Sequence, residues 1–227
     1  MKKLLDKIGG LDFYLLGLGE VDELVDFSDK IYQEIEDKST FFRSSKEEII
    51  NDLENGSFII GVYDEDKLVA FRMTVIEKYK DSLIYNLIDE IDEDEYIVCN
   101  DSCMVDKNYR GRSLQNITRD LTINNLLKKD FRHFYSTVSN KNYHSFKNVF
   151  KNGYTMVDFR SVYHNKETGE DYDRCIFYRD MEDPFEFLDY EKRINHENIE
   201  EFKEALNSNY YACDCDEKDI IFKKIKK

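Results

Sequence analysis

Residues 103–115 read Cys103-Met104-Val105-Asp106-Lys107-Asn108-Tyr109-Arg110-Gly111-Arg112-Ser113-Leu114-Gln115. An apolar strand here runs directly into a basic, turn-prone loop, and the residues that follow have the pattern of a helix. The first N–H groups of a helix lack acceptors and point outward together with the positive end of the helix dipole. With two arginines beside it, this arrangement predicts a site for phosphate groups.

Strands and helices alternate on both sides of this loop. Strands are predicted at 12–18, 58–63, 68–76, 96–105, 134–138, 154–163 and 174–180. Helices are predicted at 21–37, 45–55, 113–129 and 143–152, and 82–94 is read as helical or irregular. In the helix 113–129, Ile117, Leu121 and the stretch from Asn124 and Asn125 to Leu127 are expected on the inner face. The pattern predicts an α/β domain with a twisted central sheet flanked by helices.

The residues after Pro184 are read as an extension of this domain. A helix is predicted at 197–207, followed by strands at 210–215 and 219–225. We therefore expect a domain over 1–183 and an extension over 184–227 that packs on it. The sequence does not indicate whether the extension is a lid, a dimer strand or decoration.

Composition and charge narrow the function classes. Hydrophobic residues are 41% and charged residues 36% of the chain, which is typical of a soluble globular protein. The formal net charge of −15 repels phosphate backbones, so nucleic acid is not expected as a partner. Neither a membrane span nor a signal peptide is predicted, so a cytoplasmic location is expected. Five cysteines without a ligand spacing predict reduced thiols and no metal site.

Two motifs together resemble the GNAT superfamily of acetyl-CoA-dependent N-acetyltransferases. The first is Val105 to Gln115, which is similar to the family's strand, its Tyr-Arg-Gly spacer and its loop; Ser113 and Gln115 stand where the family has small residues, and Ser113 can cap the helix. The second is Asn142-Tyr143-His144-Ser145, followed by Val149 and by Gly153-Tyr154. The resemblance covers about residues 12–181. It implies a GNAT fold, with a mixed, mostly antiparallel sheet.

The resemblance implies acetyl-CoA as cosubstrate. Main-chain N–H groups of Arg112, Ser113, Leu114 and Gln115 are expected to hold its diphosphate, with Arg110 and Gly111 beside them. The pantetheine arm is expected to pair with Cys103, Met104 and Val105 like an additional strand. Asn142 is expected to cap its helix or contact the arm, and Ser145 to allow a close approach.

The resemblance also implies candidates for catalysis. Asp101 on the strand 96–105 is the first choice for the carboxylate that takes the proton of the incoming amine, and Glu95 at the start of that strand is the second. Asp101 could equally be a polar strand residue that faces a helix end. A free N–H near Met104 or Val105 would stabilise the oxyanion. Many members protonate the departing thiolate with a Tyr at the position of Val149, so Tyr143 or His144 would have to substitute for it.

These observations give one principal hypothesis and two alternatives. The chain is predicted to be an N-acetyltransferase that moves an acetyl group directly to a primary amine of a small molecule or protein. The sequence leaves open whether it forms a homodimer. The first alternative is a catalytically silent acyl-CoA-binding sensor, which the residue at Val149 favours and Asp101 opposes. The second is an interaction module that binds no CoA.

Overall fold

The computed structural model describes residues 2–164 and 169–226. The chain forms two compact units, each built from segments that are distant in sequence. The first unit comprises residues 1–38, 42–77 and 98–131. The second comprises residues 39–41, 78–97 and 132–227.

The strands of the first unit follow each other in sequence order, β1 to β5. They are β1 (Lys3–Ile8), β2 (Leu11–Leu15), β3 (Phe58–Asp64), β4 (Lys67–Lys78) and β5 (Tyr96–Val105). The pairs β1·β2, β2·β3 and β3·β4 are antiparallel. The turn Asp64 to Lys67 joins β3 and β4, so the predicted hairpin is confirmed.

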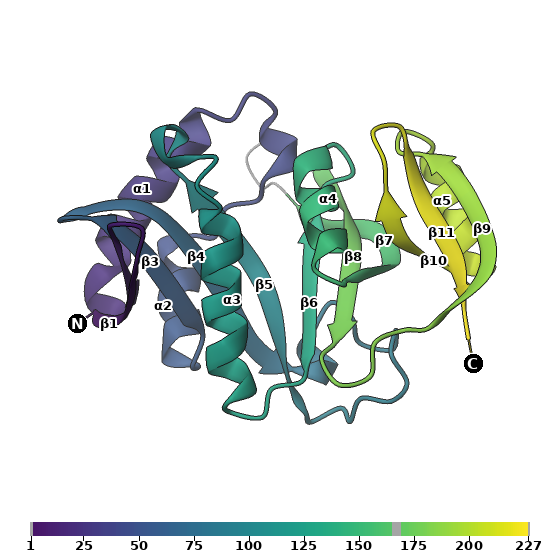
Figure 1. Cartoon of the computed structure of the whole chain (residues 1–227), viewed down its shortest axis with the longest axis horizontal. Coiled ribbons are helices and arrows are strands. Elements are labelled where there is room, and N and C mark those ends of the chain that lie inside the picture. Colours follow the sequence, from purple (N-terminus) through teal and green to yellow (C-terminus); the bar gives the residue numbers. More distant parts are fainter. Residues whose placement is uncertain (1, 165–168, 227) are drawn as a thin grey trace. The chain divides into compact units, whose positions relative to one another are not determined.

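Three α-helices cover this sheet on both faces. They are α1 (Val21–Gln33), α2 (Lys46–Glu54) and α3 (Leu114–Leu127) (Figure 1). Phe71 of β4 packs edge-on against Phe27 of α1, with ring centroids 6.0 Å apart. The next residue, Arg72, bonds Thr118 of α3 instead. Because successive strand residues point to opposite faces, α1 and α3 lie on opposite faces of β4.

The strands of the second unit lie in the order β6-β8-β7-β10-β11-β9. They are β6 (His133–Val138), β7 (Thr155–His164), β8 (Asp171–Asp180), β9 (Phe187–Asn195), β10 (Tyr210–Cys215) and β11 (Asp219–Ile225). The helices are α4 (Tyr143–Lys151) and α5 (Ile199–Asn207).

Single 3₁₀ turns span Leu18–Glu20, Lys38–Thr40, Tyr79–Asp81 and Lys107–Tyr109.

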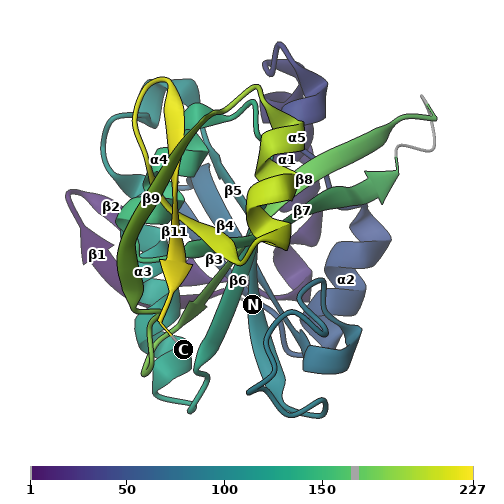
Figure 2. The same cartoon turned by 90° about the vertical axis from the view of Figure 1, so that its right-hand side faces the viewer.

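Aromatic rings hold the second unit together. Phe177 of β8 meets Phe146 and Phe150 of α4, with ring centroids 5.3 and 5.2 Å away. Figure 2 shows α5 beside the strands β9 to β11. Its fully buried Phe202 lies 6.2 Å from Phe159 of β7 and 5.5 Å from Phe222 of β11. These contacts join the C-terminal residues to the core of this unit.

The main sequence expectations for the fold are confirmed. The sheet is mixed, with one parallel pair among antiparallel pairs, and helices flank it. Strand β5 has the predicted bounds. Helix α2 begins at the predicted capping box, in which Ser45 and Glu48 bond each other's N–H groups at 3.2 and 2.7 Å. Gly153, with φ +76°, follows α4 as predicted.

Other expectations were wrong. The buried residues of α3 include Leu114, Thr118, Thr122, Ile123 and Leu126, whereas Leu127 is 39% exposed and Ile117 and Leu121 are half-buried. Threonines occupy buried positions of this helix, so the apolar pattern pointed to a wrong face. Strands β1 and β9 were not predicted; most of their residues are exposed, so neither carries a buried apolar pattern.

The C-terminal residues contain three strands rather than the two expected. Strand β10 pairs with β7 through Ala212 and Met156, and β9 pairs with β11. The division of the chain at residue 184 stays a prediction. Within the described residues, no helix combines the length and apolar character needed to span a bilayer.

Candidate functional site

Asp106, the residue that follows β5, anchors the loop that leads to α3. Its N–H donates to Val69 O of β4 at 2.9 Å. Its carboxylate accepts from Lys30 Nζ of α1 at 2.8 Å and from the Asn108 N–H at 3.0 Å. The bond from Lys30, and then that from Asn108, holds the pKa of Asp106 below its usual value. Because Asp106 is 1% exposed, these bonds fix the start of the loop.

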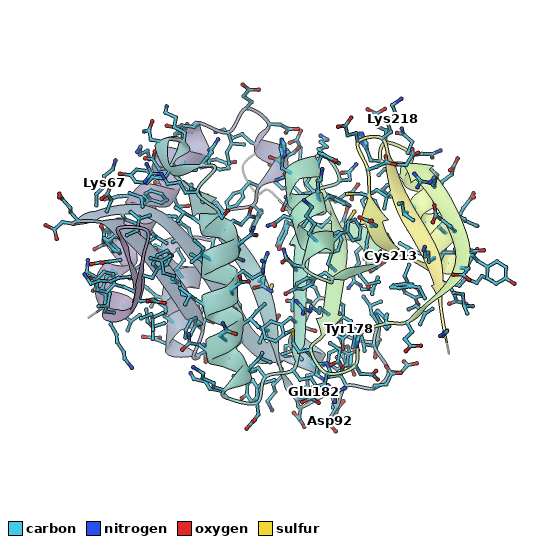
Figure 3. All side chains as sticks on the ribbon, viewed as in Figure 1. Lys67, Asp92, Tyr178, Glu182, Cys213 and Lys218 are labelled. Atoms are coloured by element: carbon cyan, nitrogen blue, oxygen red, sulfur yellow. The ribbon has the colours of Figure 1, made fainter. Side chains whose placement is uncertain are left out.

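Tyr109 anchors the middle of the same loop. Its hydroxyl donates to Asp64 Oδ2 at 2.5 Å, which ties the loop to the end of β3. The Arg112 guanidinium carbon lies 4.8 Å from the centre of the Tyr109 ring, and Nζ of Lys67 lies 5.6 Å from it. Figure 3 labels Lys67 at the β3–β4 turn. The ring therefore holds two cations next to the start of α3.

The backbone of the loop turns through two left-handed residues. Gly111 has a φ of +78° and Ser113 a φ of +58°. A residue with a Cβ adopts this region at a cost of roughly 1–2 kcal/mol, whereas glycine does not. Ser113 thus adopts a conformation that a glycine would adopt freely. Its side chain makes no capping bond, so the expectation that Ser113 caps α3 was wrong.

The N–H groups of residues 111–115 have no acceptor within the part of the chain that the structure describes. The first internal bond of the helix runs from the Asn116 N–H to Ser113 O at 2.9 Å. Beside these groups, Arg110 Nε donates to Val105 O at 3.3 Å. Successive free N–H groups at the positive end of a helix form a concave site for an anion.

Arg72 holds the first turn of α3 against the sheet. It is 6% exposed and lies within β4. Its Nη2 donates to Gln115 O at 2.9 Å and its Nε to Thr118 Oγ1 at 3.2 Å. The guanidinium satisfies a carbonyl of the helix start and places a positive charge under it. Arg72 was not among the predicted site residues.

Asp101 of β5 is half-buried and belongs to a group of interacting carboxylates. Burial raises its pKa, while the Ser102 hydroxyl, which donates at 2.8 Å, opposes the rise. Asp52, in the last turn of α2, has its pKa raised to about 6 by burial and then by the charge of Asp101. Glu48 of α2 raises both pKa values further. Carboxylates with raised pKa values are better proton acceptors near neutral pH.

The end of β5 carries the three residues expected to meet the pantetheine arm. Met104 is 3% exposed, and Cys103 and Val105 are half-buried. Val105 O accepts the bond from Arg110. The pairing of these residues with a ligand stays a prediction.

The second unit contains the second motif. The Asn142 side chain accepts from the Ser145 N–H at 3.1 Å, so Asn142 caps α4 as expected. The hydroxyl of Tyr143 is buried without a hydrogen-bond partner among the described residues. His144 is exposed and Val149 is half-buried.

Glu95, the second choice for the base, is also in this unit. Its Oε1 lies 3.3 Å from Nε2 of His133, which is 4% exposed. Nδ1 of His133 bonds the hydroxyl of Tyr178 at 2.7 Å; Figure 3 labels Tyr178 on β8. Burial lowers the pKa of His133, and Glu95 partly opposes this effect. Glu95 is thus engaged with a buried histidine.

The structure groups the predicted residues by unit. The first unit holds Asp101, Cys103, Met104, Val105 and the loop 110–115, and the second holds Glu95, Asn142, Tyr143 and Ser145. Sequence reasoning missed Arg72, Asp106 and Asp52. A lone arginine in the apolar run 68–76 was the available signal for Arg72, and Asp-x-Asn after a strand was the signal for the turn at Asp106.

No family model matches the sequence, and no curated protein does. Solved structures do match the fold. NAA60 of Arabidopsis thaliana, solved in complex with acetyl-CoA, aligns with a TM-score of 0.61 and 17% identity over 76% of this chain and 99% of that chain. An acetyltransferase of the GNAT family from Streptococcus pneumoniae aligns with a TM-score of 0.54 and 13% identity over 75% and 99%.

A third structure gives the same result. The polyamine N-acetyltransferase of Drosophila melanogaster aligns with a TM-score of 0.57 and 12% identity over 75% of this chain and 100% of that chain. Each alignment covers nearly the whole of the other protein. The chain therefore has the GNAT fold that its two motifs predicted.

The raised pKa of Asp52 predicts a pH-dependent effect of Asp52→Asn on stability. The carboxyl loses its proton near pH 4 in the unfolded chain and near pH 6 in the folded chain, so the folded chain loses stability as the pH rises through this window. Asp52→Asn should therefore raise the Tm at pH 8 and have a smaller effect at pH 4. Thermal unfolding at both pH values measures the difference.

Glu54→Gln, an exposed position of the same helix, is the matched control and should change the Tm by a similar small amount at both pH values. An Asp52→Asn protein with a lower Tm at pH 8 than the parent would contradict the interpretation.

Proposed function

We propose that this chain transfers the acetyl group of acetyl-CoA directly to a primary amine of a small molecule or protein. The observation that carries the proposal is the row of free N–H groups at residues 111–115, with Arg110 and Arg112 beside it. Two adjacent phosphoryl groups fit such a row, and acetyl-CoA carries a diphosphate. The likeness to NAA60, which was solved with acetyl-CoA bound, supports this choice of ligand.

The binding of acetyl-CoA would use residues of the first motif and of the strand before it. The N–H groups from Gly111 to Gln115 would donate to the diphosphate, and Arg110 and Arg112 would add charge. Arg72 and Asp106 act as positioning residues because they hold the two ends of the loop. The pantetheine arm would pair with Cys103 to Val105.

The amine must lose a proton before it can attack the thioester. Asp101 is our choice for the base, because burial and then the charge of Glu48 raise its pKa, which suits proton transfer near neutral pH. Glu95 is less suitable, because His133 already occupies its carboxylate.

Two further groups would assist the transfer. A main-chain N–H near Met104 or Val105 would donate to the oxyanion. The Tyr143 hydroxyl, which has no partner among the described residues, is available to donate a proton to the departing thiolate. A thiol with a pKa of about 8.5 is also a tolerable leaving group without an acid, so the substitution at Val149 would cost rate only.

The left-handed backbone at Ser113 predicts opposite effects of two substitutions. Ser113→Gly should stabilise the free protein by about 1 kcal/mol, because glycine adopts this φ without strain, and should preserve the increase in Tm caused by acetyl-CoA. Ser113→Val should reduce that increase, because a β-branched residue disrupts the loop. Urea unfolding and thermal unfolding with acetyl-CoA measure the two effects.

Asn209→Val is the matched control, because Asn209 also has a positive φ, +58°, but lies outside the loop. It should lower the Tm and leave the acetyl-CoA response unchanged. If Ser113→Val responded to acetyl-CoA as fully as the parent does, the loop would not be the binding site.

The choice of Asp101 as base predicts a loss of turnover without a loss of binding. Thiol release from acetyl-CoA with a panel of amines should fall roughly 10²- to 10⁴-fold in kcat for Asp101→Asn, while acetyl-CoA still raises the Tm. Asp66→Asn, an exposed position in the β3–β4 turn, should retain full activity. Binding without turnover by the parent protein on every amine would refute the acetyltransferase proposal and favour a sensor.

A further inference from the structure

Arg174 is a buried cation that has no carboxylate partner among the described residues. It lies within β8 and is 3% exposed. Its Nη1 donates to Asp173 O at 2.8 Å, whereas its Nη2 is buried and has no partner among the described residues. Arginine keeps its charge in proteins, and burying a charge without a counter-charge is strongly unfavourable. An arginine that a fold buries at such a cost is a candidate for binding an anion.

Two tyrosine rings lie close to the guanidinium of Arg174. The guanidinium carbon lies 5.4 Å from the ring centre of Tyr163 and 5.5 Å from that of Tyr172. The Tyr163 hydroxyl reaches Thr137 Oγ1 of β6 at 3.1 Å. These two ring contacts restrain the planar group, and Tyr163 itself is half-buried.

The neighbouring carboxylates are already engaged. Arg160 of β7 lies directly opposite Arg174 in the strand register. Arg160 Nε pairs with Asp158 Oδ2 at 3.1 Å, and its Nη2 donates to Leu83 O. Asp173 accepts from the Ser161 hydroxyl at 2.6 Å. Like charges directly opposite each other destabilise a strand pair, so this register makes the unpaired Arg174 more unfavourable still.

We propose that Arg174 binds the carboxylate of a small amino acid. Nη2 supplies the free donor, and the planar carboxylate matches the planar guanidinium. Tyr163 would turn away from Thr137 to admit it.

The position of Arg174 on the sheet argues against the cofactor as the source of the anion. Phe177 of β8 packs on α4, and residues of one parity in a strand share a face. Arg174 therefore points to the face opposite α4, the helix whose Asn142 and Ser145 are expected to meet acetyl-CoA.

Charge also favours a zwitterion. The net charge of −15 would repel a purely anionic substrate. An amino acid carries no net charge, so it avoids that repulsion and offers one group to Arg174 and another to a carboxylate.

The test compares amino acids with their carboxamides as ligands. Glycine, β-alanine and 4-aminobutanoate are titrated beside glycinamide, β-alaninamide and 4-aminobutanamide, and binding is followed as the increase in Tm. We expect at least one acid to bind the parent protein more than tenfold tighter than its amide. Arg174→Gln should abolish that preference, and Arg174→Lys, which keeps the charge but loses the planar fork, should weaken it.

Arg160→Gln is the matched control. Because Arg160 already bonds Asp158 and Leu83, this substitution should leave the preference unchanged. Without ligand, Arg174→Gln should have a Tm equal to or above that of the parent, whereas a purely structural arginine would stabilise the fold. Equal binding of every acid and its amide, or retention of the preference in Arg174→Gln, would overturn the proposal. So would weaker acetyl-CoA binding by Arg174→Gln with acid binding intact, because Arg174 would then serve the cofactor's phosphates.

A parallel titration with acetyl-CoA separates this proposal from the proposed function. An acetyl-CoA response without any preference for acids overturns the role of Arg174 alone. A preference for acids without an acetyl-CoA response supports Arg174 as a carboxylate site and refutes the acetyltransferase proposal.

Discussion

The unmet hydrogen-bonding capacity of the backbone between β5 and α3 is the constraint on which the candidate site depends. A buried strand ends at Val105 and a helix begins at Leu114, and the first N–H groups of that helix have no internal acceptor. The chain keeps these groups in one arrangement by anchoring both ends of the loop. Asp106 bonds the loop to β4 and α1, and Arg72 bonds the first turn of α3 to the sheet. The loop is thus organised before any ligand arrives, which lowers the cost of binding one.

Buried charges in this protein fall into two kinds. Arg72 and Asp106 have partners of suitable geometry, so they maintain the fold around the loop. Arg174 lacks a counter-charge among the described residues, and Asp101 is half-buried with a raised pKa beside another carboxylate. Charges of the second kind reduce stability, and a protein retains such groups where function requires them. This contrast separates residues that position the site from residues that would meet substrates.

The sequence was most informative where local rules and packing agree. The apolar run 96–105 predicted β5 with its correct bounds, and the capping box at Ser45 predicted the start of α2. It was least informative where a tertiary contact decides the structure. The buried face of α3 depends on the bond from Arg72 to Thr118, and the left-handed φ of Ser113 is not encoded by serine itself. Which side chains lie beside Arg174 also depends on the register of three strands, which a single sequence does not reveal.

The amide resonances of residues 111–115 in a ¹⁵N-labelled protein offer the most direct measurement of the central claim. If these N–H groups bind the twin phosphates, addition of CoA should shift their proton resonances downfield, as expected for N–H groups that gain charged acceptors. Pantetheine, which lacks the phosphates of CoA, is the comparison ligand and should leave these resonances unchanged. Resonances at 111–115 that do not move with CoA, while others elsewhere in the chain do, would contradict the account.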